Sequence, residues 1–216
     1  WRSTGDGKFE QFPSPITNVA TGIWGTNAAD VWVAAQPDIW HFTTAWTHET
    51  VSPGAKYIWG SSTSDVYAGG SDVVCGLGNC SSVPVIYHRN GPNSWTKQYS
   101  DSGLAGPVDT LDGLWGSGPN DLFAGRSMPG PLHSKGDGAW TAMDPAAPTD
   151  VTGIWGTSAT DVWLVGPGVY HYNGSATGPN QIASTFTATG VWGTSDGTQV
   201  FVVGADSDGT CIYHLY

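Results

Sequence analysis

Short runs of alternating apolar and polar residues recur along the whole chain, separated by turn-forming residues. In the first group this pattern predicts strands over residues 21–26, 30–34, 38–42 and 45–49. Alternation with a period of two is typical of strands that bury one face. Connectors at 90–91, 137–138 and 173–174 are Asn-Gly or Asp-Gly pairs, which favour tight hairpins. We therefore expect an all-β protein built from short antiparallel strands.

The first two strands of each group carry a repeated phrase. It consists of an aliphatic residue, Trp-Gly, a hydroxyl residue and then an Asp that opens the next strand. The repeated tryptophans are Trp24, Trp59, Trp115, Trp155 and Trp192. The Asp residues are Asp30, Asp65, Asp121 and Asp161, and the fifth copy has Gln199 instead. A unit of about 40 residues that recurs in this way indicates a propeller or a solenoid.

The two ends of the chain predict how the repeats close. The fifth unit stops one strand short, and the segment Ser3–Glu10 parallels Ser134–Thr141 of the third unit. An N-terminal strand beside Ile212–Leu215 would complete the last sheet and hide its edge. We expect one domain, a five-bladed β-propeller of four-stranded blades closed three-plus-one. The predicted blades are residues 18–52, 53–100, 108–145, 149–187, and 188–216 together with 1–12.

Composition agrees with this architecture and excludes some partners. The chain has 31 Gly and 14 Pro, which suits a fold rich in turns. Its 7 Lys and Arg give a net charge of −11 and form no basic run, so we expect no nucleic-acid partner. No apolar stretch approaches the length of a membrane span, so we expect no membrane insertion. The chain begins at Trp1, which is compatible with a removed leader.

Two of the three cysteines, Cys75 and Cys80, flank a Gly-rich tip. Their spacing lets a short loop close on itself, and we expect a disulfide between them. The alternative is a pair of reduced thiols in a flexible loop. A disulfide favours an exported protein, so we expect a secreted, extracellular or cell-surface location.

One histidine per unit stands in the third predicted strand. These are His41, His88, His133, His171 and His214. Imidazole is a common metal ligand, but third strands lie away from a propeller's axis and would hold the rings too far apart to share an ion. We expect each His to bond within its own blade, to the Asp or hydroxyl of the turn between the first two strands, as in WD-repeat propellers.

The closely spaced carboxylates of Asp206 and Asp208 are a candidate Ca²⁺ site. The run lacks a distal Glu, and the alternative is a solvated turn. Apart from this candidate, we expect no metal and no cofactor.

The unit Trp-Gly-Thr/Ser, Asp-Val-Trp and Tyr-His resembles repeats of secreted bacterial β-propellers, particularly large exported proteins of myxobacteria. By architecture, five blades of this length are also similar to the tachylectin-2-type lectins. The resemblance covers the whole chain and implies the propeller fold. Function does not follow from it, because propellers host lectins, hydrolases and scaffolds alike.

The repeated loops supply candidate ligand-binding residues, because a sugar stacks on an aromatic ring flanked by polar anchors. The candidates are Asn27, Asp30, Trp32, Thr63, Asp65, Tyr67, Asn120, Asp121, Thr160, Asp161 and Trp163. The alternative assigns the aromatic residues to the core between blades and each Asp to a hairpin cap.

These observations favour a non-enzymatic, lectin-like propeller with several weak equivalent sites for glycans. The alternative is a protein-interaction or structural module of a larger exported protein or surface assembly. A glycan-active hydrolase comes third. The three arginines, Arg2, Arg89 and Arg126, stand in contexts too dissimilar for the triad of a sialidase, and Glu10 and Glu49 both fall in predicted outer strands. We therefore name no catalytic residue.

Overall fold

The computed structural model describes residues 2–3, 5–52, 54–76, 79–101, 110–127, 130–143, 148–175, 178–184 and 186–215. Within these ranges the regular structure is entirely β, arranged in five antiparallel sheets. Each sheet is a simple meander in which neighbouring strands follow one another along the chain. We call each sheet a blade and number the blades in chain order.

The strands fall where the repeats predict them. Blade 1 holds β1 (Gly22–Asn27), β2 (Asp30–Ala35), β3 (Asp38–Phe42) and β4 (Trp46–Thr50). Blade 2 holds β5 (Tyr57–Ser62), β6 (Asp65–Gly76), β7 (Asn79–Gly91) and β8 (Ser94–Ser100). Blade 3 holds β9 (Leu111–Gly118), β10 (Asp121–Arg126), β11 (Leu132–Ser134) and β12 (Thr141–Ala142). Blade 4 holds β13 (Gly153–Ser158), β14 (Asp161–Gly166), β15 (Gly168–Tyr172) and β16 (Asn180–Ala183). Blade 5 holds β17 (Thr187–Gly193), β18 (Val200–Asp206) and β19 (Gly209–Leu215).

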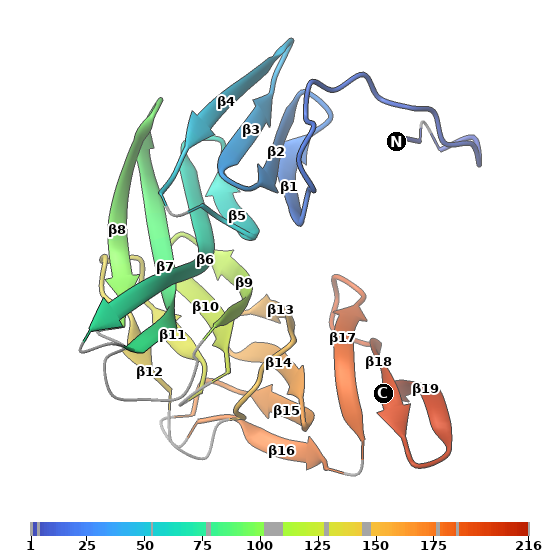
Figure 1. The fold of residues 1–216 in the computed structure, drawn as a ribbon. Coiled ribbons are helices and arrows are strands. Elements are labelled where there is room, and N and C mark those ends of the chain that lie inside the picture. The colour runs from blue at the N-terminus through green and yellow to red at the C-terminus, as the bar shows by residue number, and fades with distance from the viewer. Residues whose placement is uncertain are drawn as a thin grey trace.

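The five blades follow one another along an arc, with the first strand of each blade on the inside (Figure 1). Consecutive blades pack through these inner strands, β1 on β5, β5 on β9, β9 on β13 and β13 on β17. Among the described residues no comparable packing joins blade 5 to blade 1. The arrangement is therefore that of propeller blades, and within the described residues no packing between the first and the last blade closes it into a ring.

The predicted closure by the N-terminal strand is not established. Blade 5 contains three strands, and β19 is its outer edge within the described part of the chain. The N-terminal segment instead folds on itself, because Arg2 and Glu10 exchange backbone hydrogen bonds of 2.8 and 2.9 Å. It then crosses blade 1, where Phe12 meets the ring of Phe42 edge-on at 4.9 Å.

The repeated Trp-Gly pair is the contact that holds one blade to the next. The repeated Trp of each of the first four blades lies over the Gly of the following blade so closely that a side chain there would collide with the indole. A Cβ added at Gly60 would lie 2.7 Å from the ring of Trp24, and one at Gly156 would lie 2.9 Å from the ring of Trp115. Trp59 meets Gly116 and Trp155 meets Gly193 in the same way. Only glycine permits this approach, which explains why the two residues recur together.

The core lies between the blades. Trp32, Ile39 and Val66 are fully buried where blades 1 and 2 meet, and Tyr67, Ile86 and Leu122 are buried where blades 2 and 3 meet. Because blades 2, 3 and 4 each have a neighbour on both faces, their inner strands bury apolar residues on both sides. The interpretation of the repeated aromatic residues as core between blades is confirmed for most of them.

Candidate functional site

Each of the first four blades contains the same hydrogen-bonded network. In blade 1, His41 Nε2 lies 2.7 Å from Asp30 Oδ1, and the Thr26 hydroxyl donates to Asp30 Oδ2 at 2.6 Å. The corresponding His–Asp distances in blades 2, 3 and 4 are each 2.8 Å, for His88–Asp65, His133–Asp121 and His171–Asp161. The expectation that each histidine bonds within its own blade is confirmed for these four.

An aromatic residue of the second strand lies against each of these imidazoles, stacked in blades 1 to 3 and tilted in blade 4. Trp32 lies parallel to His41 with ring centroids 3.7 Å apart, and Phe201 repeats the arrangement with His214 at 4.3 Å in blade 5. The stack and the hydrogen bond fix the imidazole between the second and third strands. The network therefore locks the strand pairing of a blade.

The network also changes the acidity of its carboxylates. Burial raises the pKa of Asp30, but hydrogen bonds from Thr26 and His41 and the attraction of His41 outweigh burial and hold the pKa below its ordinary value. Asp161 is placed in the same way, with hydrogen bonds from Thr157 and His171 outweighing burial and lowering its pKa. The ionised carboxylate is therefore the form that the fold stabilises.

Most of the sequence-predicted ligand-binding residues belong to this network or to the core. Asp30 and Asp121 are buried, Asp65 and Asp161 are half-buried, and all four accept bonds from a histidine and a hydroxyl. Trp32 and Tyr67 are buried and Trp163 is half-buried. The four candidates at the tips of the turns are exposed, namely Asn27, Thr63, Asn120 and Thr160. They lie one to a blade, so the fold does not gather them into one site.

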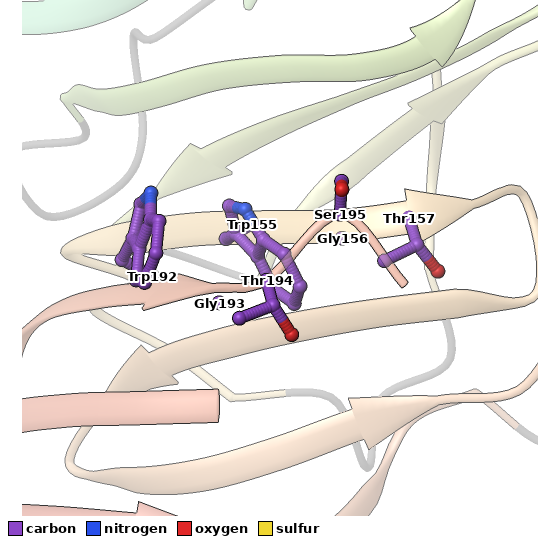
Figure 2. A pocket seen from close by; sticks show the side chains of 7 residues that line it. All are labelled: Trp155, Gly156, Thr157, Trp192, Gly193, Thr194 and Ser195. Carbon is purple, nitrogen blue, oxygen red and sulfur yellow. The ribbon is translucent and has the colours of Figure 1, made fainter. Parts of the chain in front are cut away.

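A pocket of about 620 Å³ lies at the inner strands of blades 4 and 5 (Figure 2). Its walls are Trp155, Gly156 and Thr157 of blade 4 and Trp192, Gly193, Thr194 and Ser195 of blade 5. Figure 2 shows the indole of Trp192 next to that of Trp155, with the side chains of Thr157, Thr194 and Ser195 nearby. This is the candidate functional site, since it combines aromatic surface with hydrogen-bonding groups.

Sequence reasoning missed this pocket. Trp155 and Trp192 were assigned to the repeated core position, and Trp155 does pack on Gly193 as that assignment requires. Trp192 differs because 60% of its surface is exposed. No signal in the repeat marks this difference, because Trp192 occupies the same place in its unit as the other repeated tryptophans.

The candidate calcium turn is held by its own hydrogen bonds. Asp206 accepts from the Tyr213 hydroxyl at 2.8 Å and from the backbone N–H of Asp208 at 2.9 Å, and it joins β18 to β19. Within the described ranges, no group of three or more His, Cys, Asp or Glu is placed to hold a metal ion. Nor do those ranges contain a helix with the length and apolarity needed to cross a membrane.

The two glutamates lie in different surroundings. Glu49 is buried in blade 1 and receives Arg89 Nη2 at 2.7 Å and the Trp95 indole N–H at 2.8 Å, both from blade 2. Glu10 is exposed in the N-terminal segment. Glu49 is therefore part of a contact between blades rather than a free acid.

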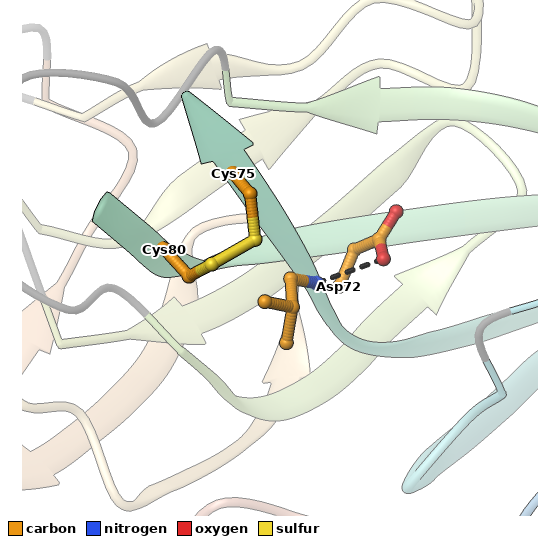
Figure 3. Close-up of a disulfide and its surroundings, with 4 residues drawn as sticks. Asp72, Cys75 and Cys80 are labelled. Atoms are coloured by element: carbon orange, nitrogen blue, oxygen red, sulfur yellow. Dashed lines mark hydrogen bonds between the residues drawn. A yellow bond between two sulfur atoms is a disulfide. The ribbon is translucent and has the colours of Figure 1, made fainter. Parts of the chain in front are cut away.

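The predicted disulfide between Cys75 and Cys80 is present (Figure 3). The two residues pair directly across β6 and β7, whose hairpin is longer than that of any other blade in the described structure. Figure 3 shows Asp72 on the same strand, where its carboxylate accepts the Val73 backbone N–H at 2.8 Å. In its described residues the insertion is thus a paired extension of the hairpin that departs from the repeat.

No family model matches the chain, and no curated protein matches it either. Several solved structures share its fold. A GH74 enzyme of Niastella koreensis aligns with a TM-score of 0.64 and 14% identity over 92% of this chain and 36% of that one. The extracellular domain of a putative hybrid two-component system from B. thetaiotaomicron aligns with a TM-score of 0.68 and 10% identity over 95% of this chain and 28% of that one. A structure of YCF48 bound to D1 peptide aligns with a TM-score of 0.59 and 13% identity over 93% of this chain and 70% of that one.

These likenesses concern the fold alone, because the identities are so low. The chain spans about a third of the length of the first two proteins and 70% of YCF48. Together with the stacked four-stranded blades, the alignments identify the architecture as of the β-propeller type.

Proposed function

We propose that this chain is a non-enzymatic propeller module that acts by binding a protein partner, as part of an exported protein or a surface assembly. One observation carries the proposal. The repeated polar residues are engaged inside the blades, whereas the side chains left accessible at the arc's end are large and apolar, above all Trp192. Exposed apolar surface of this kind is typical of protein-binding sites.

Two further observations support this function. The pocket at Trp155 and Trp192 lies on rigid inner strands, which present a binding surface at little entropic cost. One of the proteins that shares the fold, YCF48, was solved with a peptide bound. The disulfide supports an exported location, since such bonds persist in oxidising compartments.

Selection of displayed peptides on the intact chain tests the proposal. Selected peptides are expected to be aromatic or aliphatic, and their affinity should fall at least tenfold in Trp192→Ser, which removes the exposed indole. Val73→Ser is the matched control, because Val73 is 65% exposed in the distant β6–β7 hairpin. Failure to select any peptide, or equal binding by both variants, contradicts the proposal.

Carbohydrate binding is the second candidate function. An indole beside Thr157, Thr194 and Ser195 offers a sugar both a stacking face and hydroxyl partners. This would be a single site between blades 4 and 5 rather than a set of equivalent sites. A glycan array probed with the wild-type chain and with Ser195→Ala, which removes a hydroxyl of the pocket outside the His–Asp network, separates the candidates. Glycans that bind the wild type and lose affinity in the variant would favour the lectin.

A further inference from the structure

We infer that the two ends of the arc are complementary binding surfaces, and that the face of blade 5 binds the face of blade 1 in a second copy of this chain. The inference goes beyond the proposed function, because the partner is the chain itself and the first blade takes part. It rests on the design of the contacts between consecutive blades, which recurs four times in the structure.

One face of blade 5 lies open. Cross-strand pairing places Trp192 beside Phe201, and Val203 beside Ile212, so all four side chains share a face. In blade 4 the residues equivalent to Val203 and Ile212 are Val165 and Val169, which are 0% and 1% exposed beneath blade 5. Val203 and Ile212 are 42% and 72% exposed. Blade 5 therefore carries a complete contact surface with no blade upon it in the described structure.

The opposite face of blade 1 carries the matching half. Ile23 is 74% exposed, whereas the equivalent Ile58 of blade 2 is 6% exposed beneath blade 1. Gly25 is the repeated glycine of blade 1, and the three atoms nearest to a Cβ built on it all belong to the backbone of Asp30 and Val31, whereas an indole atom is among the three nearest at the repeated glycines of the other blades. Blade 1 thus offers the glycine that Trp192 lacks.

A hydroxyl group gives an independent indication. Thr21 and Thr152 stand three residues before a repeated Trp, and each donates to a backbone carbonyl of the following blade, at 2.9 and 2.8 Å. Thr189 occupies the same place before Trp192. It bonds to the Val203 carbonyl of its own blade at 3.3 Å, as its equivalents also do within theirs. Because Thr189 lies at the open edge of blade 5, no following blade in the described structure offers it the second backbone carbonyl that Thr21 and Thr152 reach.

The N-terminal segment limits where the second copy can bind. Phe12 packs on Phe42, and Pro13 accepts the Trp46 indole N–H at 2.9 Å, so the segment covers the outer strands of this face. Ile23 and Gly25 lie on the inner strand, away from these contacts. The inner part of the blade 1 face therefore remains accessible. In the contacts between consecutive blades, this part meets the repeated Trp of the preceding blade, so in a second copy it would meet Trp192.

A contact between unlike surfaces of identical copies is heterologous, and it adds copies from head to tail. It also allows a complementation experiment on the whole chain. Ile23→Asp places a charge on the blade 1 face, and Ile212→Asp places one on the blade 5 face. Both positions are highly exposed, so neither change should impair folding. Val73→Asp is the control matched in charge and exposure.

Sedimentation velocity over a range of concentrations reads out the association. The wild type and Val73→Asp are expected to form larger species as concentration rises, and each face variant should weaken the association at least tenfold. An equimolar mixture of the two face variants should form a one-to-one dimer and nothing larger, because one intact pair of faces remains.

Three results would overturn the inference. The first is a wild type that stays monomeric at roughly 100 µM, where a contact of about 5 kcal/mol would be populated. The second is face variants that associate as the control does. The third is a mixture that fails to dimerise although both variants fold, as judged by circular dichroism. Because none of these measurements uses a peptide or a glycan, they leave the proposed function to its own tests.

Discussion

At the scale of single residues, one pair explains most of the sequence pattern. In the first four blades the indole of the repeated Trp covers a glycine of the next blade, and the following Asp bonds to both a histidine and a hydroxyl within its own blade. The first contact joins blades and the second secures them internally. A repeat needs both, because a single sheet cannot bury its two apolar faces alone.

Two glycines of β9 provide a matched test of the close approach. A Cβ on Gly116 would lie 2.7 Å from the ring of Trp59, whereas one on Gly118 would meet nothing within 4 Å. Gly116→Ala should therefore lower the free energy of unfolding by about 1–3 kcal/mol through overpacking. Gly118→Ala should change it by less than about 0.5 kcal/mol. Urea denaturation measures both, and equal midpoints would show that the indole contact is dispensable.

The lowered pKa values of Asp30 and Asp161 predict acid sensitivity. A carboxyl group with a depressed pKa in the folded state stabilises the fold fully above its unfolded value of 3.8, and this contribution is lost as pH falls through the folded value. We expect the melting temperature to drop steeply below about pH 4. The double variant Asp30→Asn and Asp161→Asn should show a shallower drop between pH 6 and pH 3. An unchanged slope would contradict this assignment.

At the scale of elements, the sequence predicted the strands closely. All four strands of blade 1 fall within a residue or so of their predicted bounds, because alternation and hairpin dipeptides are local signals. The predicted intrablade role of the histidines is confirmed in the first four blades, where each imidazole bonds to the Asp that opens the second strand. Closure could not be predicted in this way. It depends on the angle accumulated over successive blades, which no local pattern encodes.

The candidate site, too, could be predicted from the sequence only in part. The sequence identified repeated Asp and aromatic residues, and the fold uses most of them internally. The accessible residues are those at which the repeat ends, such as Trp192 and Ile23. Their exposure results from the missing neighbour and not from residue type, so periodicity could not distinguish them from their buried equivalents.

The β6–β7 hairpin is an element that should behave independently. Its disulfide closes only a short loop, and the strands continue their pairing on the inner side of Cys75 and Cys80. Replacing both cysteines by serine should cost about 2 kcal/mol or less. Tryptophan fluorescence should stay unchanged, because the extension contains no Trp. Loss of cooperative unfolding in the double variant would show that the hairpin supports the blades.

At the scale of the whole molecule, the blades act as a series of neighbours. Each packs on the next, so stability is expected to be the sum of blade terms and interface terms. The buried contact of Glu49 with Arg89 and Trp95 is an interface term that joins blades 1 and 2.

Removing that carboxylate tests how strongly the blades are coupled. Glu49→Gln leaves the half-buried Arg89 guanidinium without its charge partner, which should cost about 3–5 kcal/mol. Lys97→Met is the control, since Lys97 and Asp72 form an exposed pair 3.7 Å apart, for which less than about 1 kcal/mol is expected. Calorimetry should also show a broader transition for Glu49→Gln, as blade 1 unfolds ahead of the rest. Equal effects of the two changes would contradict the coupling.

The repeated indoles of the first four blades all lie against the following blade, so the series has a direction. Each unit contributes an indole to the contact with the following blade and a glycine to the contact with the preceding blade. A duplicated unit inserted at any junction would accordingly find a suitable neighbour on either side without a compensating substitution. A gene built from such units can gain or lose whole units. The encoded protein then has more or fewer blades, while the contacts between blades stay the same.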